Sequence, residues 1–392
     1  MTEITSILQV LVLFCIGVPI VIFGIYGSII LYYNKAKKNH STEPLNAESN
    51  KYEPTVSVIV PTHNEISIIS KRIENFLSTD YPKEKLEVLF VDDSDDSTPE
   101  IIQEYSKNNP CIHLLRFNQR MGYSPSLIAG CNAAKGEIVV FAEASSFFEP
   151  DTVHQLVKNF RNPEIGAVTG KDMLLNLNEK MGQSENSYLK ILDFVRQGES
   201  NMDSTVWMKG EAAAVRKSLI NDLDKLTAPG TADTAIALFV RSKGSRFVFD
   251  PEVKFYEYSP STRDGRVKQK TIRAANLIKV IWSFRTLFFK REYGKFGSVT
   301  LPFNFAMLAL APVFILAAAI SLVALTFFEP MLSLIIWAII GLALAVGFAF
   351  YRQLIITFFE FEFSLLKASY EIIFVRKSHD KIDKVASTRR PA

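Results

Sequence analysis

The sequence is poor in the features that mark several common classes of site. It holds 3 cysteines in 392 residues, with no Cys-x-x-Cys pair and no cysteine–histidine cluster, which argues against a structural zinc site. No glycine-rich dinucleotide or P-loop pattern follows the first predicted strand, so a dehydrogenase or P-loop site would lack its phosphate cradle. The net charge is only +3, and this balance does not suggest a nucleic-acid partner.

Charged residues are absent from three long apolar stretches. Residues 7–33, 303–328 and 331–351 hold no Asp, Glu, Lys or Arg. At about 1.5 Å per residue, each can cross a hydrocarbon core of about 30 Å. The first is not typical of a signal peptide, because it lacks a positive leading segment and a small-residue cleavage site. We therefore expect a transmembrane anchor over residues 1–34 and two transmembrane helices within 301–352.

Basic residues gather beside these stretches and predict the orientation of the chain. By the positive-inside rule, the middle of the chain and its C-terminus lie on the cytoplasmic side of a multi-pass cell-membrane protein. Residues 35–54 are polar and predict a cytoplasmic linker. The segment 353–392 is apolar at first but holds Glu360, Glu362, Lys367 and Glu371, which are costly at mid-bilayer. There we expect a helix at the interface or packed against the bundle, with a basic tail; a fourth span is the alternative.

Residues 55–274 alternate between strand and helix patterns. Predicted strands cover 55–61, 86–94, 112–116 and 137–142, and predicted helices cover 66–78, 99–106, 124–134 and 151–160. The strands are continuously apolar, which is typical of strands buried on both faces. The pattern predicts an α/β fold with a doubly wound, mostly parallel sheet.

Polar residues follow each predicted strand, where ligands bind in such sheets. The four segments are 62–65, 92–96, 116–122 and 143–145. Three of them are acidic, and the remaining one carries Arg116 and Arg120. Carboxylates and arginines at one crevice suit a ribose, a diphosphate and a divalent cation. Taken singly, each acidic segment could instead be a solvated turn with helix caps, and for Glu143 alone the two interpretations are about equally good.

Several motifs in this order resemble a known family. The segments VSVIVPTHNE, FVDDSDDSTPEII and AAKGEIVVFAEASSFFEPDTV are followed by APGTADTAIALFVRSKGSRFVFDP and KTIRAANL. Together they resemble a membrane-bound family 2 glycosyltransferase with the GT-A fold, of the hyaluronan- and cellulose-synthase-like branch. The resemblance implies a nucleotide-sugar half over 55–150 and an acceptor half over 151–274.

The resemblance also implies roles for individual residues. Pro61, Thr62, Glu65, Asp92, Asp93 and Arg120 would bind the donor, together with Lys270 and Arg273, which fall on the family's Gln-x-x-Arg-Trp segment. Glu143 and Ser145 stand at the family's metal motif and would hold Mg²⁺ or Mn²⁺. Asp233 stands at the catalytic base, although it could be a simple helix N-cap. On the acceptor side we expect Glu185, Tyr188 and Glu199, although a plain helix surface explains these three residues equally well.

This sequence departs from the family pattern at several of these positions. Glu143 replaces an aspartate, Ser145 removes a carboxylate, and Ala274 replaces a tryptophan that would offer an acceptor sugar an aromatic platform. Tyr123 stands where a lysine is common. One glutamate can still hold a cation if the donor phosphates complete the coordination shell.

The segment 275–300 has apolar residues at helical spacing and basic residues between them, which predicts an amphipathic helix at the membrane interface. The alternative is a helix packed on the sheet domain. An interface helix favours a lipid-linked or growing glycan acceptor beside the lipid bilayer. Few spans are available to enclose a polymer channel, so we expect limited transfer or a polymerase that forms a homo-oligomer.

The sequence thus predicts an inverting glycosyltransferase that uses a nucleoside diphosphate sugar, with a UDP-sugar favoured by the resemblance. A catalytically silent relative that binds nucleotide-sugar or scaffolds a membrane assembly remains the alternative, because parts of the metal motif are altered. A transporter is a weaker hypothesis, since the apolar stretches carry no polar pathway.

Overall fold

The computed structural model describes residues 2–40, 52–177, 180–223, 232–258 and 263–375. One sheet organises the domain between the apolar ends, with the strand order β3-β2-β1-β4-β7-β6-β8-β5. Its strands are β1 (Val56–Thr62), β2 (Leu86–Asp92), β3 (Ile112–Arg116), β4 (Ile138–Ala142), β5 (Phe147–Phe148), β6 (Ile165–Leu174), β7 (Ala212–Arg216) and β8 (Arg246–Glu257). The helices of this domain are α2 (Ile69–Leu77), α3 (Thr98–Asn108), α4 (Tyr123–Ala133), α5 (Thr152–Val157), α6 (Lys180–Met202), α7 (Ala232–Ser242) and α8 (Arg263–Ser283).

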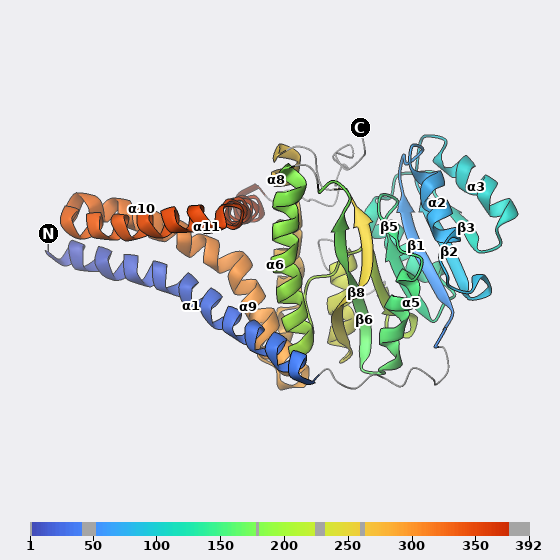
Figure 1. Cartoon of the computed structure of the whole chain (residues 1–392), viewed down its shortest axis with the longest axis horizontal. Coiled ribbons are helices and arrows are strands. Elements are labelled where there is room, and N and C mark those ends of the chain that lie inside the picture. The colour runs from blue at the N-terminus through green and yellow to red at the C-terminus, as the bar shows by residue number, and fades with distance from the viewer. Residues whose placement is uncertain (1, 41–51, 178–179, 224–231, 259–262, 376–392) are drawn as a thin grey trace.

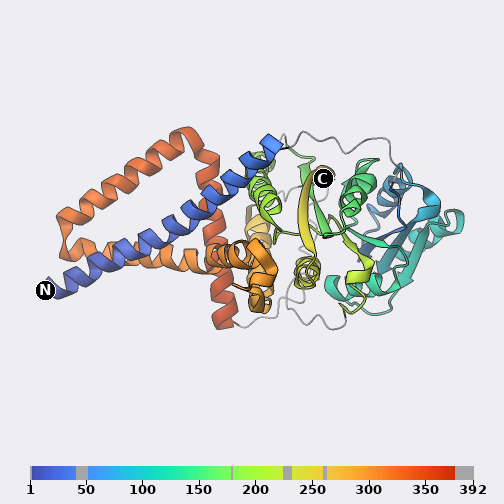
Figure 2. The ribbon, with the colours of Figure 1, turned by 90° about the horizontal axis from the view of Figure 1, so that it is seen from below.

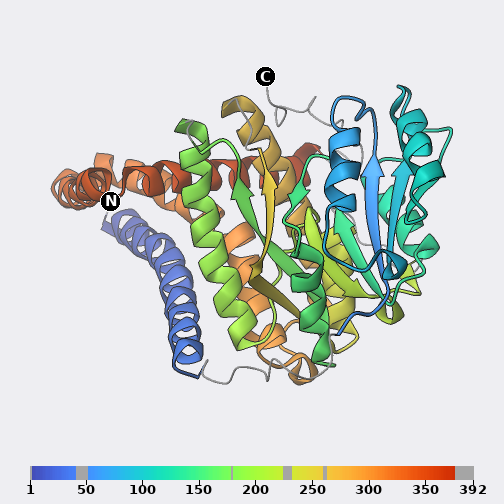
Figure 3. The ribbon, with the colours of Figure 1, turned by 45° about the vertical axis from the view of Figure 1, so that its right-hand side comes forward.

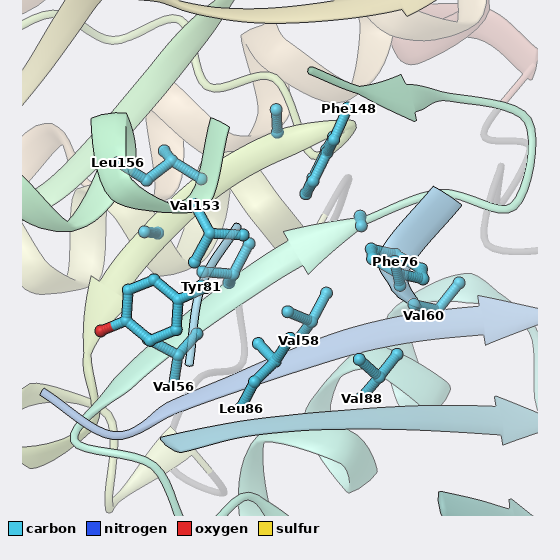
Figure 4. Close-up of a cluster of buried hydrophobic side chains, with 14 of the residues drawn as sticks. Val56, Val58, Val60, Phe76, Tyr81, Leu86, Val88, Phe148, Val153 and Leu156 are labelled. Carbon is cyan, nitrogen blue, oxygen red and sulfur yellow. The ribbon is translucent and has the colours of Figure 1, made fainter. Parts of the chain in front are cut away.

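The predicted α/β sheet is confirmed. The first four long strands pair in parallel, β3 with β2, β2 with β1 and β1 with β4. The two faces of β1 enter different apolar clusters: Val58 and Val60 pack with α2 and α5, whereas Ile59 packs with α4 and α7. Figure 4 shows the first of these clusters over β1, β2 and β4. Burial on both faces explains why these strands read as continuous apolar runs.

The second half of the sheet is mixed. β7 runs antiparallel to both β4 and β6, while β6 and β8 are parallel. The last residue of β4, Ala142, pairs with the first residue of β7, Ala212. The chain just before β7 therefore lies beside the carboxyl end of β4.

Among the described residues, three helical stretches are long and apolar enough to cross a membrane: Glu3–Ala36, Phe296–Phe328 and Pro330–Phe374. The first is part of α1 (Thr2–His40), the second contains α9 (Leu301–Phe305) and α10 (Ala311–Phe328), and the third contains α11 (Pro330–Tyr370). Figure 1 shows α1, α10 and the first half of α11 extending away from the sheet on one side. Many of their large apolar side chains are exposed, as expected for a surface that lipid covers.

The helix α11 kinks at Tyr351, where the backbone leaves helical geometry (φ −135°, ψ 36°). Beyond the kink the helix changes direction and runs across the base of the other membrane helices (Figure 2). Its buried residues Glu360, Leu365 and Ala368 face α6 and α8. Packing against protein removes part of the cost of acidic residues in this apolar stretch.

The expected interface helix over 275–300 is not one helix. Residues 276–283 are the end of α8, followed by 3₁₀ turns at Arg285–Leu287 and Arg291–Tyr293 and a π-helix at Phe296–Thr300. Leu277, Ile278 and Ile281 are buried in a cluster shared with α7 and α11. The apolar face of this segment is therefore covered by protein, as in the alternative interpretation.

Candidate active site

Asp92 ends β2 and joins three neighbouring strand ends. Its carboxylate accepts hydrogen bonds from Thr62 Oγ1 and Ser94 Oγ, each at 2.7 Å. It also pairs with Arg116 at the end of β3, and it is fully buried. These contacts hold the wall of the crevice together, and a contact of Asp92 with a nucleobase stays a prediction.

Asp93 fixes the loop that carries Arg120. One carboxylate oxygen accepts hydrogen bonds from the backbone N–H of Met121 at 2.7 Å and of Gly122 at 3.0 Å, and the other lies 2.9 Å from His63 Nδ1. Gly122 has φ 86°, a conformation that favours glycine. Arg120 itself is exposed. The predicted gathering of these segments at one end of the sheet is thus present.

The loop after β1 is equally well fixed. Glu65 is buried, with 3% of its surface exposed, and its backbone N–H donates to Thr98 Oγ1 at 2.9 Å. Asn64 has φ 56°, and its side-chain oxygen accepts from the N–H of Asp95 at 2.8 Å. Pro61, which is partly exposed, ends the pairing of β1 together with Thr62.

Glu143 and Ser145 lie in the turn after β4, beside the end of β1, since Ile59 pairs with Phe141 in the parallel register. Both are partly exposed. Ser146 closes the turn: its hydroxyl lies 3.2 Å from the carbonyl oxygens of both Glu143 and Glu211. The turn is therefore tied to the segment that precedes β7.

Asp233 lies in the first turn of α7 and faces the same segment. Its Oδ2 accepts a hydrogen bond from the backbone N–H of Gly210 at 3.2 Å, and its Oδ1 accepts from the N–H of Thr234 at 2.8 Å. A Cβ atom added to Gly210 would lie 2.9 Å from Asp233 Oδ2 and 2.5 Å from the Tyr123 hydroxyl. The carboxylate and the phenol thus flank one glycine.

The Tyr123 hydroxyl marks the point at which the predicted groups converge. Burial raises the pKa of Tyr123 well above its usual value, and the carboxylates of Asp233, Glu143 and Glu211 raise it further, whereas Arg273 lowers it. These four groups come from α7, the turn after β4, the segment before β7, and α8. The geometry agrees: the N–H of Gly210 donates to Asp233, Glu211 pairs with Arg273, and the carbonyl of Glu211 accepts from Ser146 in the turn that holds Glu143. The segment before β7 therefore links Asp233, Arg273 and the Glu143 turn, while the roles of these residues stay predictions.

Arg273 is surrounded by acidic groups. One guanidinium nitrogen lies 3.1 Å from a carboxylate oxygen of Glu211. Burial acts to lower the pKa of Arg273, but Glu211, Glu257, Glu143 and Asp172 raise it above its usual value. A permanently charged arginine here can neutralise an anionic leaving group.

Lys270 belongs to a different group from Arg273, although both lie on α8. Its Nζ is 3.1 Å from a carboxylate oxygen of Glu185 and 4.4 Å from the ring centroid of Tyr188. Lys270 is also buried, with 9% of its side chain exposed. The structure thus groups Lys270 with Glu185 and Tyr188 on α6, which the sequence predicts on the acceptor side, whereas Lys270 itself is predicted at the donor.

The prediction of Glu199 as an acceptor-side residue is corrected. Glu199 is fully buried where α6 lies between the sheet and α1 (Figures 1 and 3). Its carboxylate accepts hydrogen bonds from Thr205 Oγ1 at 2.5 Å, from Asn304 Nδ2 at 2.6 Å and from Tyr26 of α1. It therefore joins α1 and α9 to the domain and is not accessible to an acceptor.

The segment Lys209 to Glu211 was missed from the sequence. It supplies the N–H that holds Asp233, the carboxylate that pairs with Arg273, and Lys209, which pairs with Asp172 of β6. The rule that ligands bind at the carboxyl ends of parallel strands does not reach this segment, because it precedes an antiparallel strand. A Gly between two charged residues just before an apolar run was the available signal.

A divalent cation would find few protein ligands at this crevice. The described residues contain no group of three or more His, Cys, Asp or Glu side chains placed to hold a metal ion. Glu143 offers a carboxylate and Ser145 a hydroxyl, both oxygen donors of the kind that Mg²⁺ and Mn²⁺ accept. Glu143 and Ser145 therefore fit a cation whose remaining ligands are supplied mainly by the donor phosphates.

The comparison with known proteins follows this geometry. The family model for Glycosyl transferase family 2 matches residues 57–222, a range that holds the four strand-end segments and Gly210. Residues 57–222 of this chain are thus similar to a family 2 glycosyltransferase domain. Its recognition from the sequence motifs is confirmed.

Two relatives and one solved structure illustrate the similarity. A probable glycosyltransferase of Bacillus subtilis is 29% identical over 62% of this chain and 60% of its own length. A poly-beta-1,6-N-acetyl-D-glucosamine synthase of Staphylococcus epidermidis is 24% identical over 67% of this chain and 65% of its own. The chain thus matches less than two thirds of the length of these relatives.

A mannosyltransferase of Pyrobaculum calidifontis, solved with GDP-mannose and Mn²⁺, has the same fold. It aligns with a TM-score of 0.74 and 24% identity over 94% of this chain and 100% of its own. This likeness confirms the GT-A-type fold.

Proposed function

We propose that this protein is an inverting glycosyltransferase that moves a sugar from a nucleoside diphosphate sugar to a membrane-associated acceptor at the cytoplasmic face. The observation that carries the proposal is that the segment before β7 contacts Asp233, Arg273 and the turn that holds Glu143. A base, a cation ligand and a fixed positive charge are the groups that such a transfer needs.

In this mechanism Asp233 accepts the proton of the acceptor hydroxyl as that oxygen attacks the anomeric carbon. The N–H groups of Gly210 and Thr234 stabilise the Asp233 carboxylate in its charged form and orient it. Arg273, held by Glu211, neutralises charge on the departing diphosphate. A divalent cation bound at Glu143 and Ser145 would supply further positive charge to that leaving group.

The donor enters where the three strand-end loops meet. Pro61 and Arg120 are accessible there and would contact the donor directly, whereas Thr62, Glu65 and Asp93 are buried and would hold the loops in place. A UDP-sugar is the favoured donor, although the similar mannosyltransferase was solved with GDP-mannose. Both nucleotides therefore belong in the test.

The acceptor is proposed to be lipid-linked or a growing glycan. The group Glu185, Tyr188 and Lys270 supports this, because Tyr188 also lies 5.8 Å from Phe361 of α11, measured between ring centroids. The acceptor half of the domain thus touches the part of α11 that runs across the base of the membrane helices. A multi-pass protein with its domain on the cytoplasmic side is consistent with the three apolar helices.

The test is release of nucleotide by the purified protein in lipid bilayers. UDP- and GDP-sugars are supplied with Mn²⁺ and native membrane lipid, and the anomeric configuration of the product is read by NMR. Release with inversion supports the proposal. Binding of nucleotide-sugar by calorimetry without any turnover would favour the silent relative, and retention of configuration would refute the proposed mechanism.

A further inference from the structure

A buried polar network joins the membrane helices to the domain where α1, α6 and α9 meet (Figure 1). Its centre is Asn304 of α9, which is fully buried. The Nδ2 of Asn304 donates to Glu199 of α6 at 2.6 Å and lies 3.0 Å from the Tyr26 hydroxyl of α1. A polar side chain in a stretch that can cross a membrane is costly unless protein groups satisfy it. The network therefore fixes α9 against α1 and α6.

Trp207 extends this network from α9 towards the proposed active site. Its indole N–H donates to Asn304 Oδ1 at 2.9 Å, and its backbone N–H donates to Thr205 Oγ1 at 3.2 Å. The Thr205 hydroxyl donates in turn to Glu199 at 2.5 Å. Both the side chain and the backbone of Trp207 are thus tied to the groups that hold the membrane helices.

The chain after Trp207 leads directly to the proposed base. Three residues further along, Gly210 lies at most about 11 Å away. The N–H of Gly210 donates to Asp233 Oδ2 at 3.2 Å, and Glu211 pairs with Arg273 at 3.1 Å. The ring of Trp207 also packs against an apolar cluster with side chains from α7 and α8, the helices that carry Asp233 and Arg273. One short segment therefore connects α9 with the base.

We propose that Trp207 is a positioning residue through which the membrane helix α9 sets the place of the catalytic base. The inference rests on the proposed function for the role of Asp233. The sheet holds the same segment from its other side, because Thr169 Oγ1 of β6 accepts from the N–H of Lys209 at 2.9 Å. That contact remains without the indole, so loss of the Trp207 bond should loosen the segment around Gly210 without releasing it.

The first measurement needs no variant. The chain holds 3 tryptophans, so ¹⁵N labelling of their indole groups gives a simple NMR spectrum of the full-length protein in lipid nanodiscs. The indole N–H of Trp207 should exchange with deuterium at least about tenfold more slowly than that of Trp282, which is half-exposed, because a hydrogen bond protects it. Equal exchange of the two would exclude the bond to Asn304 and overturn the inference.

Trp207→Phe keeps an aromatic ring and removes the indole donor. In the full-length variant in nanodiscs, deuterium exchange of the peptide that contains Gly210 should rise about tenfold. Peptides from β1 and β2 should exchange as in wild type, which shows that the domain is folded. Because Asp233 is then held less firmly, kcat should fall about tenfold while KM for the donor stays within about twofold of wild type.

Trp337→Phe is the matched control. The indole N–H of Trp337 on α11 donates to Thr326 Oγ1 of α10 at 3.3 Å, so this variant also loses an indole bond between two segments of the chain. That bond lies within the membrane helices and does not lead to Gly210. Exchange around Gly210 and kcat should both match wild type in Trp337→Phe.

Three results with the variants would overturn the inference. One is unchanged exchange around Gly210 in folded Trp207→Phe, and another is raised exchange there with unchanged kcat. The third is an equal fall of kcat in Trp337→Phe, since any lost indole bond would then have the same effect. Exchange is measured without substrate. A wild type without turnover would therefore refute the proposed function, while the exchange results would still decide whether Trp207 fixes the segment.

Discussion

Replacing Gly210 by alanine tests the geometry around Asp233 most sharply. The added Cβ would lie 2.5 Å from the Tyr123 hydroxyl, 2.9 Å from Asp233 Oδ2 and 3.3 Å from Asp233 Cβ. Gly210 does not have a positive φ, so alanine introduces no backbone strain. The effect of Gly210→Ala should therefore come from contact with these two side chains.

The size of the effect follows from the displacement that the methyl group requires. An ordinary contact lies near 3.4 Å or more, so the Tyr123 hydroxyl must move by about 0.9 Å and Asp233 Oδ2 by about 0.5 Å. Overpacking of this kind costs about 1–3 kcal/mol of the free energy of unfolding. A shift of about 1 Å in a catalytic group lowers the rate about 100-fold, so the smaller shift of Asp233 should lower kcat about 10-fold.

The assay compares kcat for nucleotide release with the midpoint of thermal unfolding. Gly341→Ala is the control, because a Cβ there meets no atom within 4 Å, and it should match wild type. Adding Tyr123→Phe to Gly210→Ala removes the atom at 2.5 Å and should restore part of the activity, if Tyr123 itself is dispensable. Activity of Gly210→Ala within about threefold of wild type would contradict the placement of Asp233 as the base.

Three further predictions concern other parts of the molecule. Glu199→Gln turns an N–H towards groups that donate to the carboxylate, so it should lower the free energy of unfolding by about 2–4 kcal/mol; an unchanged midpoint in thermal unfolding would contradict this. Arg273→Lys keeps the charge but loses the planar guanidinium, and should lower kcat/KM for the donor about 10-fold or more; equal kinetics would exclude Arg273 from donor binding. Burial raises the pKa of Cys131 to about 12. Above about pH 8.5 the Cys131 thiol therefore stays protonated in the folded protein, whereas it loses its proton in the unfolded chain. Stability should then fall as the pH rises above about 8.5, and rapid labelling of Cys131 by a thiol reagent at pH 8 would refute its burial.

The parallel half of the sheet could be predicted because each strand carries its own signal. Burial on both faces requires continuous apolar runs, and the strand ends gather by the rule for parallel sheets. The strand Ile112–Arg116 has the predicted bounds. The strand β2 ends at Asp92, before the predicted end at residue 94, because the side chain of Asp92 accepts hydrogen bonds that fix the following turn.

The features that could not be predicted depend on contacts between segments that are distant in the sequence. Nothing local marks β7 as antiparallel, so the position of Gly210 beside Asp233 could not be predicted. The periodicity of residues 276–283 shows an apolar face but not what covers it, and α7 and α11 do so in the fold. Glu199 and Arg72 lie on helices with ordinary patterns, and only tertiary packing reveals that both are buried.

The central claim is that Asp233 is the base of a sugar transfer in the crevice formed by the strand ends. The most direct test is Asp233→Asn, which keeps the size of the side chain and removes the carboxylate. With the donor identified, we predict that nucleotide-sugar binding by calorimetry stays within about threefold of wild type while kcat falls at least about 100-fold. Full turnover in Asp233→Asn would contradict the account, whatever the donor.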